Sequence, residues 1–444
     1  MKSKEKIGRL ILRISLIFMV LLSIVLSAII WGSDTRFSRI EQTSSRTTNK
    51  DLGQKSLRDM YVPTQVFYYR NNKMYQVYDG KNNLPLEFTK ITESLTRNRV
   101  SLVSTKAQNY RKMLNKRDYM QLTYPDQITM PLFLTGLSKK DSREFNRFFV
   151  PTKNSHYLYL GNDNNNYLYR INVNNLSFAK LYKHVKQANT KIEVSLSKFK
   201  DGYSVIYENS PQMQVYSYLT YQESDSYFVY RLLGSGSPAQ RNTGNTVIYS
   251  NGSYQRLIAA KKTHNYEFVD YQQNKVPKLM TSRLMESLYY VRRIGLSEPD
   301  LRFFDADKDI FMYQNFVEEY PIFLPGRYNA RAQVKFASNG MTINFNSLDL
   351  QIPVPTTNSK KTLEPTNKAI QRLEQAGYKK ADIEKILIGY TIQETNDKKD
   401  NLVDLQPTYY VKINNAWQSL DDWLNLDVKI DQQGNVKEGL VDGL

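Results

Sequence analysis

The hydrophobic residues of this 444-residue chain follow different spacings along its length. Near the N-terminus, an uncharged apolar run extends from Ile14 to Trp31. Farther along, most apolar residues alternate with polar ones, and in a few segments they recur every three or four residues. Alternation is typical of strands with one buried face, whereas the longer spacing is typical of amphipathic helices. The pattern predicts an α+β protein, mainly antiparallel sheet with a few helices, preceded by one apolar helix.

The apolar run is long enough to cross a membrane. As a helix, its length is about 27 Å, close to the roughly 30 Å of a bilayer's hydrocarbon core. A cleaved signal peptide is the alternative, but its apolar region is shorter, about 7 to 15 residues, and ends in a small-x-small motif. Residues Ala28 to Trp31 do not provide that motif. We therefore predict an uncleaved transmembrane helix over residues 10–32.

Charges on either side of this helix predict its orientation. Basic side chains cluster before it, whereas the first charges after it cancel; the basic residues are Lys2, Lys4, Lys6, Arg9 and Arg13. Basic flanks stay on the cytoplasmic side of a membrane. We expect residues 1–9 to form a cytoplasmic tail, and the bulk of a single-pass protein to lie outside the cell membrane.

Small residues follow one face of the predicted helix. Ser15, Ser23 and Ser27 share an i, i+4 row, with Ala28 beside it. Small side chains at this spacing let a second helix approach closely, and serine can hydrogen-bond across the contact. The alternative is that each serine bonds back to its own helix on a lipid-facing surface. These four residues are the candidate interaction site of the sequence.

Beyond the helix, composition predicts a linker and three folded segments. Residues 33–58 are polar and rich in Ser and Thr, as a juxtamembrane linker is. A domain takes roughly 100 to 200 residues, so the remainder is too long for one. The predicted domains are an N-terminal domain over 59–207, a middle α+β domain over 208–355 and a C-terminal α+β domain over 356–444.

Within these segments, apolar spacing also predicts individual elements. The expected helices are Glu87 to Thr96, Leu176 to Ala188, one from Met280 that ends at Gly295, one from Ala369 that ends at Gly377, and another containing Ile383, Ile386 and Leu387. The intervening segments read as strands, joined by turns such as Lys200-Asp201-Gly202 and Asn414-Asn415.

The residues that usually carry metal or thiol chemistry are scarce. The chain has no cysteine, and His156, His184 and His264 each lack a second ligand nearby in sequence. The run from Asp305 to Asp309 resembles a calcium loop, but Ile310 and Phe316 stand where an EF-hand needs glycine and glutamate. We therefore predict a solvated turn there and no metal.

Candidate catalytic motifs are equally weak. Glu318 and Glu319 are adjacent, and neighbours on a strand point to opposite faces, so they are poor partners for acid–base chemistry. The string "LLGSGSPAQ" from Leu232 to Gln240 follows a strand-like run and leaves no helix whose N-terminus a phosphate could cap, so it predicts a loop. We predict no enzyme activity and no cofactor.

The balance of charge favours anionic partners. The net charge is +18, from 61 Lys and Arg against 43 Asp and Glu, and most of it lies beyond the first 13 residues. Nucleic acid, anionic lipid and an anionic wall polymer all fit this charge. The 33 tyrosines could stack on single-stranded nucleic acid, but tyrosine is common in half-buried strands and the sheet domains are expected outside the cell. We therefore predict no nucleic-acid partner.

Several strings, in this order, resemble the YycH (WalH) family over almost the whole chain. They are "VPTQVFYY" from Val62 to Tyr69, "NFVEEYPIFL" from Asn315 to Leu324, and the C-terminal strings "LIGYTIQET" and "LQPTYYVKINNAWQSL". None is a catalytic motif, so the resemblance rests on their order and spacing behind a single anchor.

The resemblance implies an accessory regulator of low-GC Gram-positive bacteria. Members of the family act beside the sensor histidine kinase WalK (YycG), which with the response regulator WalR controls cell-wall metabolism, and beside a sister protein, YycI. Contact through transmembrane helices would engage Ser15, Ser23, Ser27 and Ala28. The alternative is an exterior module that binds an anionic wall polymer or another extracellular ligand and uses its helix as a tether.

Overall fold

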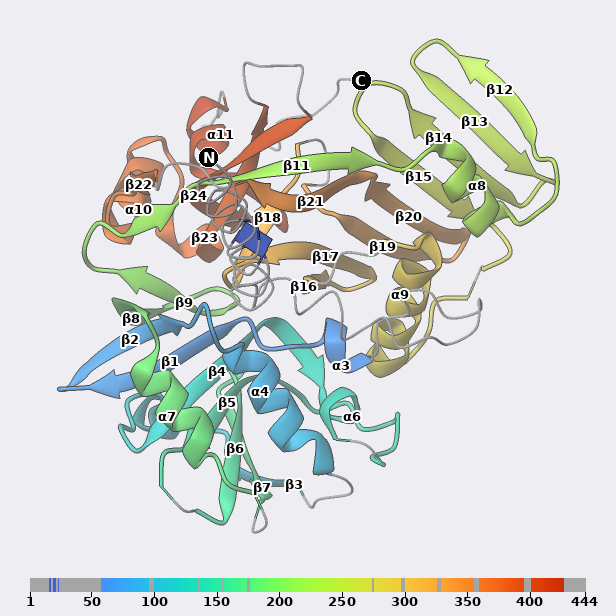
Figure 1. Ribbon diagram of the computed structural model, residues 1–444. Helices are drawn as coiled ribbons and strands as arrows, with labels where there is room; N and C mark the ends of the chain where they lie inside the picture. Colours follow the sequence, from blue (N-terminus) through green and yellow to red (C-terminus); the bar gives the residue numbers. More distant parts are fainter. Residues whose placement is uncertain are drawn as a thin grey trace, which may run out of the picture. The chain divides into compact units, whose positions relative to one another are not determined.

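Two sheets, formed by different parts of the chain, build the folded body in the computed structural model (Figure 1). The structure describes Leu16, Met19, Val20, Ser23 and residues 57–95, 100–134, 136–153, 155–173, 176–273, 275–296, 300–325, 329–354, 359–394 and 401–426. Residues Met1–Leu52 form one unit and residues Gly53–Leu444 another. Both sheets belong to the second unit.

The N-terminal unit carries the predicted span. Leu16, Met19, Val20 and Ser23 are helical and their side chains are exposed. The rest of the predicted span, including Ser15, Ser27 and Ala28, lies outside the described residues. Among the residues that are described, no helix is both long enough and apolar enough to cross a membrane.

The first sheet is antiparallel throughout and has nine strands, in the order β3-β7-β6-β5-β4-β1-β2-β8-β9. In chain order the strands are β1 Gln65–Arg70, β2 Lys73–Tyr78, β3 Val100–Ser104, β4 Tyr119–Thr129, β5 Glu144–Pro151, β6 Tyr157–Asn162, β7 Tyr167–Asn172, β8 Thr190–Phe199 and β9 Gly202–Tyr207. The register of β4 against β5 shifts between Thr123 and Ile128, and such a bulge re-aims the residues within it.

Helices of this part pack their apolar sides on the sheet. They are α4 Leu84–Ile91, followed by the 3₁₀ turn η1 Thr92–Ser94, then α5 Ala107–Leu114, α6 Met130–Phe133 and α7 Ala179–Gln187. Helix α4 begins earlier than predicted, because the Asn83 side chain caps it by accepting a hydrogen bond from the Leu86 N–H. Helix α7 lies within its predicted range.

The second sheet has fourteen strands, with the path β12-β13-β14-β15-β20-β19-β17-β18-β23-β24-β11-β21, while β16 pairs with β17 and β25 with β24. Its strands are β11 Tyr216–Gln222, β12 Ala239–Thr243, β13 Thr246–Asn251, β14 Gln255–Ala260, β15 Asn265–Asp270, β16 Leu301–Asp307, β17 Ile310–Val317, β18 Tyr320–Phe323, β19 Ala332–Ala337, β20 Gly340–Asn346, β21 Leu348–Val354, β23 Ile383–Glu394, β24 Leu402–Ile413 and β25 Ala416–Ser419. Strands β18 and β23 are parallel, whereas the other pairs of this sheet are antiparallel. A short ribbon pairs β10 Gln212–Gln214 with β22 Lys360–Thr362. The prediction of mainly antiparallel sheet with several helices is confirmed.

The remaining helices begin with α3 Leu57–Met60, which precedes β1 in the chain but contacts β16 and α9. The others are α8 Asp225–Leu233, α9 Met280–Ile294, α10 Thr366–Gln375, the 3₁₀ turn η2 Lys380–Asp382 and α11 Leu420–Asn425. Helix α9 is confirmed, and it ends where Gly295 adopts a left-handed conformation with φ 88°. Helix α10 is also confirmed. The strand-like reading before Gly234 is wrong, because Phe228 and Leu232 recur at helical spacing and are buried in α8.

The predicted helix containing Ile383, Ile386 and Leu387 is wrong, since these residues lie in strand β23. The pairing of β23 with β24 shifts register between Ile383 and Lys385. A bulge of this kind inserts one extra residue, so Ile383 and Ile386 are both buried at a spacing that imitates a helix.

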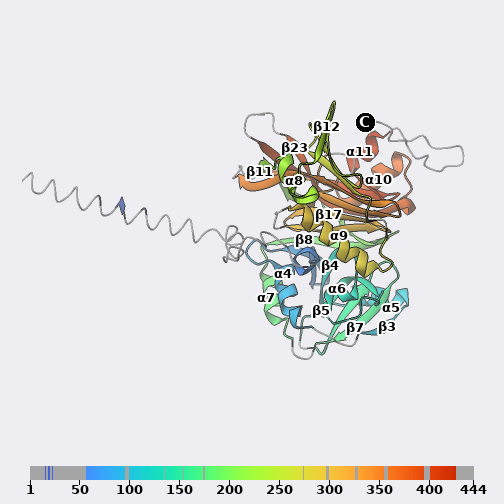
Figure 2. The same cartoon turned by 90° about the vertical axis from the view of Figure 1, so that its right-hand side faces the viewer.

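The two sheets share their hydrophobic cores. One cluster of buried residues combines Leu122 and Phe148 of the first sheet with Phe303 and Ile343 of the second. Helix α9 contacts both sheets: it packs on β19 and β4, and the Thr281 hydroxyl donates to that of Thr129 at 2.9 Å. Figure 2 shows α9 between the two layers. The first and second sheets are therefore joined by packing as well as by the chain.

Candidate functional site at the junction of the two sheets

A small polar cavity lies where the sheets meet. Its volume is about 60 Å³, and its lining includes Arg147 and Asp163 from the first sheet and Phe304 and Lys385 from the second. Ligand pockets in proteins usually enclose about 300 to 1,000 Å³. The cavity is therefore too small for an ordinary substrate, and the charged groups around it are the feature to explain.

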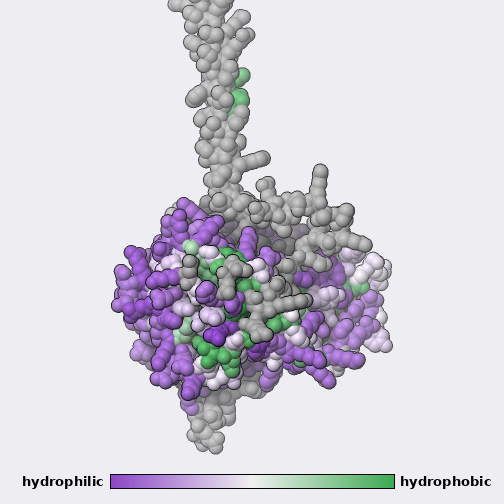
Figure 3. Space-filling view, turned by 90° about the horizontal axis from the view of Figure 1, so that it is seen from below, coloured by the Kyte–Doolittle hydropathy of each residue, from purple (hydrophilic) through white to green (hydrophobic). Residues whose placement is uncertain are grey.

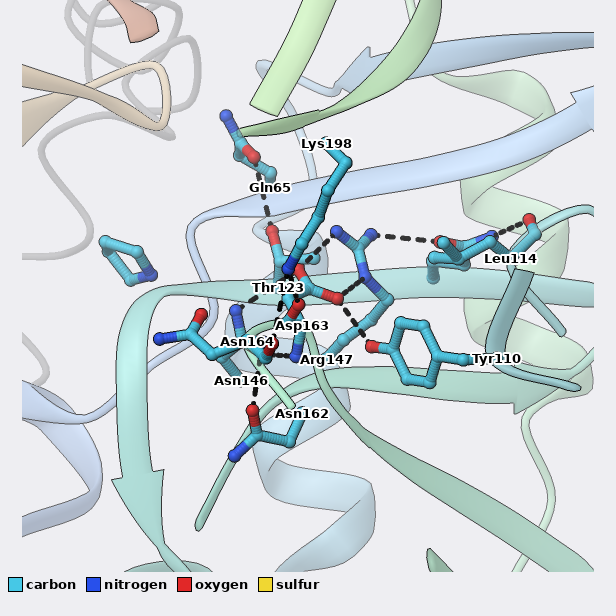
Figure 4. Close-up of polar contacts among 12 residues, drawn as sticks. Gln65, Tyr110, Leu114, Thr123, Asn146, Arg147, Asn162, Asp163, Asn164 and Lys198 are labelled. Atoms are coloured by element: carbon cyan, nitrogen blue, oxygen red, sulfur yellow. Dashed lines mark hydrogen bonds and ion pairs between the residues drawn. The ribbon is translucent and has the colours of Figure 1, made fainter. Parts of the chain in front are cut away.

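Arg147 and Asp163 form the first buried ion pair (Figure 4). Arg147 lies on β5, and its Nε and Nη2 donate to the two carboxylate oxygens of Asp163 at 2.9 and 2.7 Å. Only 2% of each side chain is exposed. The Nη1 of Arg147 donates to Gln121 Oε1 on β4 at 3.0 Å. A two-point contact of this kind fixes the orientation of both groups as well as their charge.

Neighbouring side chains complete the bonding of Asp163. The hydroxyl of Tyr110 and the amide of Asn146 donate to its carboxylate, while Lys198 donates to its backbone carbonyl. Tyr110 reaches it across Gly161 on β6, where an added Cβ would lie 2.4 Å from the tyrosine oxygen. Glycine at 161 therefore permits helix α5 to approach the sheet closely enough for this bond.

These groups keep one protonation state. Burial, and then the charge of Asp163, raise the pKa of Tyr110 well above its ordinary value. The pKa of Arg147 is raised, because the attraction and hydrogen bonds of Asp163 outweigh the burial that opposes it. The tyrosine therefore stays neutral and the arginine charged, so neither residue is poised to exchange a proton near neutral pH.

A second ionic cluster lies in the other sheet. Asp305 on β16 accepts from Lys412 Nζ at 2.7 Å and from the indole Nε1 of Trp417 at 3.0 Å. Lys385 on β23 lies 3.4 Å from the other oxygen of Asp305. Only 3% of the side chains of Asp305 and Lys412 is exposed, so each charge relies on its partners rather than on water.

Lys385 connects this cluster to the first sheet. Its Nζ lies 2.8 Å from Asp126 Oδ1, and the second oxygen of Asp126 accepts from the backbone N–H of Ala306 at 2.9 Å. Asp126 lies in the irregular part of β4, where the register shift turns it toward the second sheet. An ion pair and a backbone hydrogen bond thus cross from β4 to β23 and β16.

Electrostatic interactions in this cluster keep both lysines protonated. The pKa values of Lys385 and Lys412 are raised: burial opposes the charged forms, but the nearby carboxylates outweigh it. The pKa of Asp305 is lowered, because Lys412 and Lys385 outweigh its burial. Burial, with Asp305 as a like charge, raises the pKa of Asp126 despite Lys385.

The turn between β8 and β9 makes a further connection. Lys200 lies 2.9 Å from the buried Glu384 of β23, and the N–H of Asp201 donates to the Glu384 carbonyl at 3.1 Å. The other oxygen of Glu384 accepts from the N–H of Asn415. Glu384 therefore joins one turn of the first sheet to another of the second.

The chain enters the folded body at this same junction. Tyr61, which follows α3, is buried, and its hydroxyl donates to the carbonyl of Leu284 at 2.8 Å. The same hydroxyl lies 3.2 Å from that of Tyr313, and its ring packs on Phe303. Helix α9 and the second sheet therefore hold the first folded residues beyond the predicted linker.

Sequence reasoning missed most of these residues. It placed Asp305 in a solvated turn, whereas only Lys308 and Asp309 form the turn and Asp305 is 2% exposed. The partners Lys385 and Lys412 lie 80 and more residues away, so spacing could not join them to Asp305. A usable signal was the presence of lone charges within apolar strands, as in "FNRFFV" around Arg147 and "YYVKI" around Lys412.

Other candidate residues have structural places. Glu318 and Glu319 do not lie on a strand as expected, but form the turn between β17 and β18, with φ of 47° and 73°. His184 Nδ1 lies 2.7 Å from Glu87 Oε2, which joins α7 to α4. Within the described residues, no group of three or more His, Asp and Glu is arranged to hold a metal ion.

Much of the surface is polar. Seen from below, the described residues are largely hydrophilic, with a smaller hydrophobic area in their midst (Figure 3). Two large apolar side chains of the first sheet are also exposed. They are Leu102 and Val103 on the edge strand β3, which are 56% and 46% exposed.

Comparisons with known proteins identify the family. A family model described as the N-terminal domain of YycH protein matches residues 10–190, and one described as its C-terminal domain matches residues 204–427. No curated protein matches the chain. The crystal structure of YycH from Bacillus subtilis is similar in fold, with a TM-score of 0.66 and 15% sequence identity over 83% of this chain and 97% of that one. With its two halves matched in order by the two models, the chain belongs to the YycH family.

Proposed function

We propose that this protein is a non-enzymatic accessory regulator of a WalK-type sensor histidine kinase that controls cell-wall metabolism. The observation that carries the proposal is family membership over both halves of the chain. In this proposal the protein acts with a YycI-type sister protein, and its effect is to bias the kinase between two states rather than to transform a substrate.

The geometry of the junction supports a mechanical role. The buried charges described above are partnered and the cavity between the sheets is water-sized, so this region is suited to holding a shape. Tyr61 attaches the start of the folded body to α9 and the second sheet. A force or displacement acting on the body would therefore reach residues 57–61 without being absorbed by a loose connection.

We further propose how the chain is arranged at the cell membrane. Residues 10–32 cross it once, residues 33–58 form the linker, and the domains over 59–207, 208–355 and 356–444 lie outside. Ser15, Ser23, Ser27 and Ala28 face the helices of the kinase or of the sister protein, because small residues allow close helix contact.

Photocrosslinking in living cells tests this contact. A photoreactive residue is placed at Ser23 or Ser27, and the captured partners are identified by mass spectrometry. Position Val25 is the control, since residues two apart point to different sides of a helix. We expect kinase and sister-protein helices to be captured from the serine positions and not from Val25. Equal capture from all three positions would contradict the proposed face.

The alternative function is binding of an anionic wall polymer, favoured by the net charge of +18. Replacing residues 10–32 with an unrelated span distinguishes the two. Loss of kinase regulation in a transcriptional reporter supports helix contact. Regulation that survives the replacement, together with polymer binding that weakens steeply with salt, supports the tethered module instead, because exposed charges are screened within about 8 Å at physiological ionic strength.

A further inference from the structure

The net positive charge is concentrated in one half of the folded body. Residues 57–207, which contain every strand of the first sheet, have 24 Lys and Arg against 11 Asp and Glu. Residues 208–426 are nearly balanced, with 25 against 24. A charge asymmetry between two parts of a chain indicates an anionic partner for the basic part. The first sheet and its helices are therefore the part that such a partner would meet.

One concentration of this charge lies on α5 and the turn that follows it. No acidic residue occurs between Glu93 and Asp118. The same stretch has five exposed basic side chains, which we call the α5 surface: Lys106, Arg111, Lys112, Lys116 and Arg117. In the described part of the chain, none of the five forms an ion pair with a carboxylate. Their charges are therefore not neutralised within the fold.

The buried side of α5 fixes the direction of these charges. Tyr110, Met113 and Leu114 pack with Phe149 of the first sheet. Arg111 and Lys112 fall on the opposite side of the helix and point away from the sheet. The hydrogen bond from Tyr110 to the buried Asp163 holds the helix in this orientation.

Exposed apolar side chains lie beside the α5 surface. Leu102 and Val103 are on the edge strand β3, at the point where its pairing with β7 shifts register. Ser104 accepts hydrogen bonds from the Lys106 N–H and the Asn109 amide, which ties the end of β3 to the start of α5. Edge strands are usually protected by charged side chains or proline rather than by aliphatic ones. A basic surface beside exposed aliphatic residues is suited to lipid headgroups, whereas a hydrophilic polymer gains nothing from Leu102 and Val103.

We propose that the α5 surface, together with Leu102 and Val103, binds an anionic lipid surface. The five cations attract the phosphate headgroups, and each Lys or Arg near such a surface strengthens binding roughly fivefold. The two aliphatic side chains add apolar burial among the headgroups. This inference goes beyond regulation of a kinase and does not depend on it, because it concerns only the folded body and lipid.

Helix α7 provides a matched surface on the other side of the sheet. Its exposed basic residues are Lys180, Lys183 and Lys186. Leu181 of α7 shares a core with Phe148, whereas the adjacent Phe149 packs under α5, and neighbours on a strand point to opposite faces. Figure 2 shows α5 and α7 on opposite sides of the first sheet. Every residue of α7 is described, and none of its large apolar side chains is exposed.

A single fluorescent label tests which face contacts lipid, because the chain contains no cysteine. Gln108→Cys places the label on the exposed side of α5, and Gln187→Cys places it on α7. The full chain is reconstituted into vesicles of phosphatidylcholine, or of equal parts of phosphatidylcholine and phosphatidylglycerol, with a nitroxide-headgroup lipid as quencher. We expect phosphatidylglycerol to raise quenching at least about threefold at position 108 and less than about 1.5-fold at position 187. Salt at about 1 M, which screens charges within about 3 Å, should abolish the increase.

Charge removal is compared between the two faces in the Gln108→Cys chain. One variant combines Arg111→Gln, Lys112→Gln and Lys116→Gln, and the control combines Lys180→Gln, Lys183→Gln and Lys186→Gln. The first should retain less than about a fifth of the phosphatidylglycerol effect and the control more than about two thirds, although each loses three charges. Leu102→Asn should also reduce the effect at least about twofold without changing the charge. Denaturant midpoints establish that the variants fold.

The inference is overturned if phosphatidylglycerol does not increase quenching at position 108, or if it increases quenching equally at position 187. It is also overturned if the control variant loses as much of the effect as the α5 variant, because the charge would then act diffusely. Soluble poly(glycerol phosphate) tests the other class of partner. If this polymer changes the fluorescence at position 108 while phosphatidylglycerol does not, the α5 surface binds an anionic polymer and the proposed lipid contact is wrong. None of these measurements involves the kinase.

Discussion

Arg147 and Asp163 lie against each other with only 2% of each side chain exposed, and Asp305 and Lys412 with 3%. Buried pairs of this kind add little net stability compared with an apolar core, but removing one member leaves a charge that neither water nor a partner stabilises. We infer that these residues favour one arrangement of the strands, because a slipped pairing would leave a buried charge without its partner.

Removing the charge of Asp305 should be strongly destabilising. Asp305→Asn leaves Lys412 and Lys385 without their shared carboxylate, and we expect the free energy of unfolding at about pH 7 to fall by about 3 to 5 kcal/mol. Denaturant unfolding of the full chain measures the change. Asp421→Asn is the control, since its side chain is 70% exposed, and it should change stability by less than about 1 kcal/mol.

The difference in stability between the natural chain and Asp305→Asn has a predictable pH dependence. The pKa of Asp305 in the folded state is below its ordinary value of 3.8, so its stabilising effect is present above that value and is lost as pH falls through the folded pKa. The difference in stability between natural chain and variant should therefore be constant near neutral pH and shrink below about pH 4. Asp126 has the opposite effect: its pKa is raised in the folded state, so its contribution to stability increases as pH falls. A difference that grows on acidification would contradict the assignment.

Turns and bulges decide how the strands meet. Asn414 and Asn415 form the turn between β24 and β25 with φ of 50° and 60°, and Glu318 and Glu319 form a similar turn between β17 and β18. Two residues with positive φ match the twist of a hairpin, and asparagine tolerates this conformation better than glutamate does. The bulges in β4 and β23 then turn Asp126 and the start of β23 toward each other.

Substitutions at Asn415 should raise or lower the stability of the protein, depending on the residue that is introduced. Asn415→Gly removes the steric cost of the left-handed conformation and should stabilise the protein by up to about 1 kcal/mol, whereas Asn415→Val should destabilise it by about 1 to 3 kcal/mol. The bond from the Asn415 N–H to Glu384 is unchanged in both. Thermal unfolding of the two variants gives the comparison, and an equal shift in both would exclude backbone strain as the cause.

The elements that sequence predicted well are those whose cause is local. Helix α9 has its apolar repeat and its terminal Gly295 within one segment, and the turn at Asn414-Asn415 is a local signal as well. The apolar spacing within β23 predicts a helix, because that spacing depends on a bulge that only pairing with β24 creates. The ionic clusters were missed for the same reason, since Asp126, Asp305 and Lys385 meet only when three distant strands do.

As a whole, the folded body combines two sheets that share a core and are joined across a charged junction. Leu122 and Phe148 of the first sheet share a core with Phe303 and Ile343 of the second, and the pair of Asp126 and Lys385 crosses between them. Because apolar burial is the main source of stability, a shared core makes separate unfolding of either sheet unfavourable. The N-terminal family model ends at residue 190, where β8 begins, and the C-terminal model starts at residue 204 within β9, so the boundary between the two models falls inside the first sheet.

A double-mutant cycle measures the coupling across this junction. Asp126→Asn and Lys385→Met should each destabilise the protein, and the double variant should be less destabilised than their sum by about 1 to 3 kcal/mol. Lys73 and Glu193 provide the control cycle, since their side chains are 57% and 31% exposed and both lie in the first sheet, where we expect less than about 1 kcal/mol. Additive effects at Asp126 and Lys385 would mean that the pair does not join the sheets energetically.

The position of Tyr61 also has a consequence for biosynthesis. Its hydrogen-bond partners Leu284 and Tyr313 lie 223 and 252 residues later in the chain. At a translation rate of about 5 to 20 residues per second, Tyr61 waits at least about 10 to 45 seconds before either partner has been made. During that interval the first sheet can form while the entry segment stays undocked. Docking of the N-terminal end therefore has to follow the synthesis of α9 and β17, and a chain truncated before Leu284 would lack this attachment altogether.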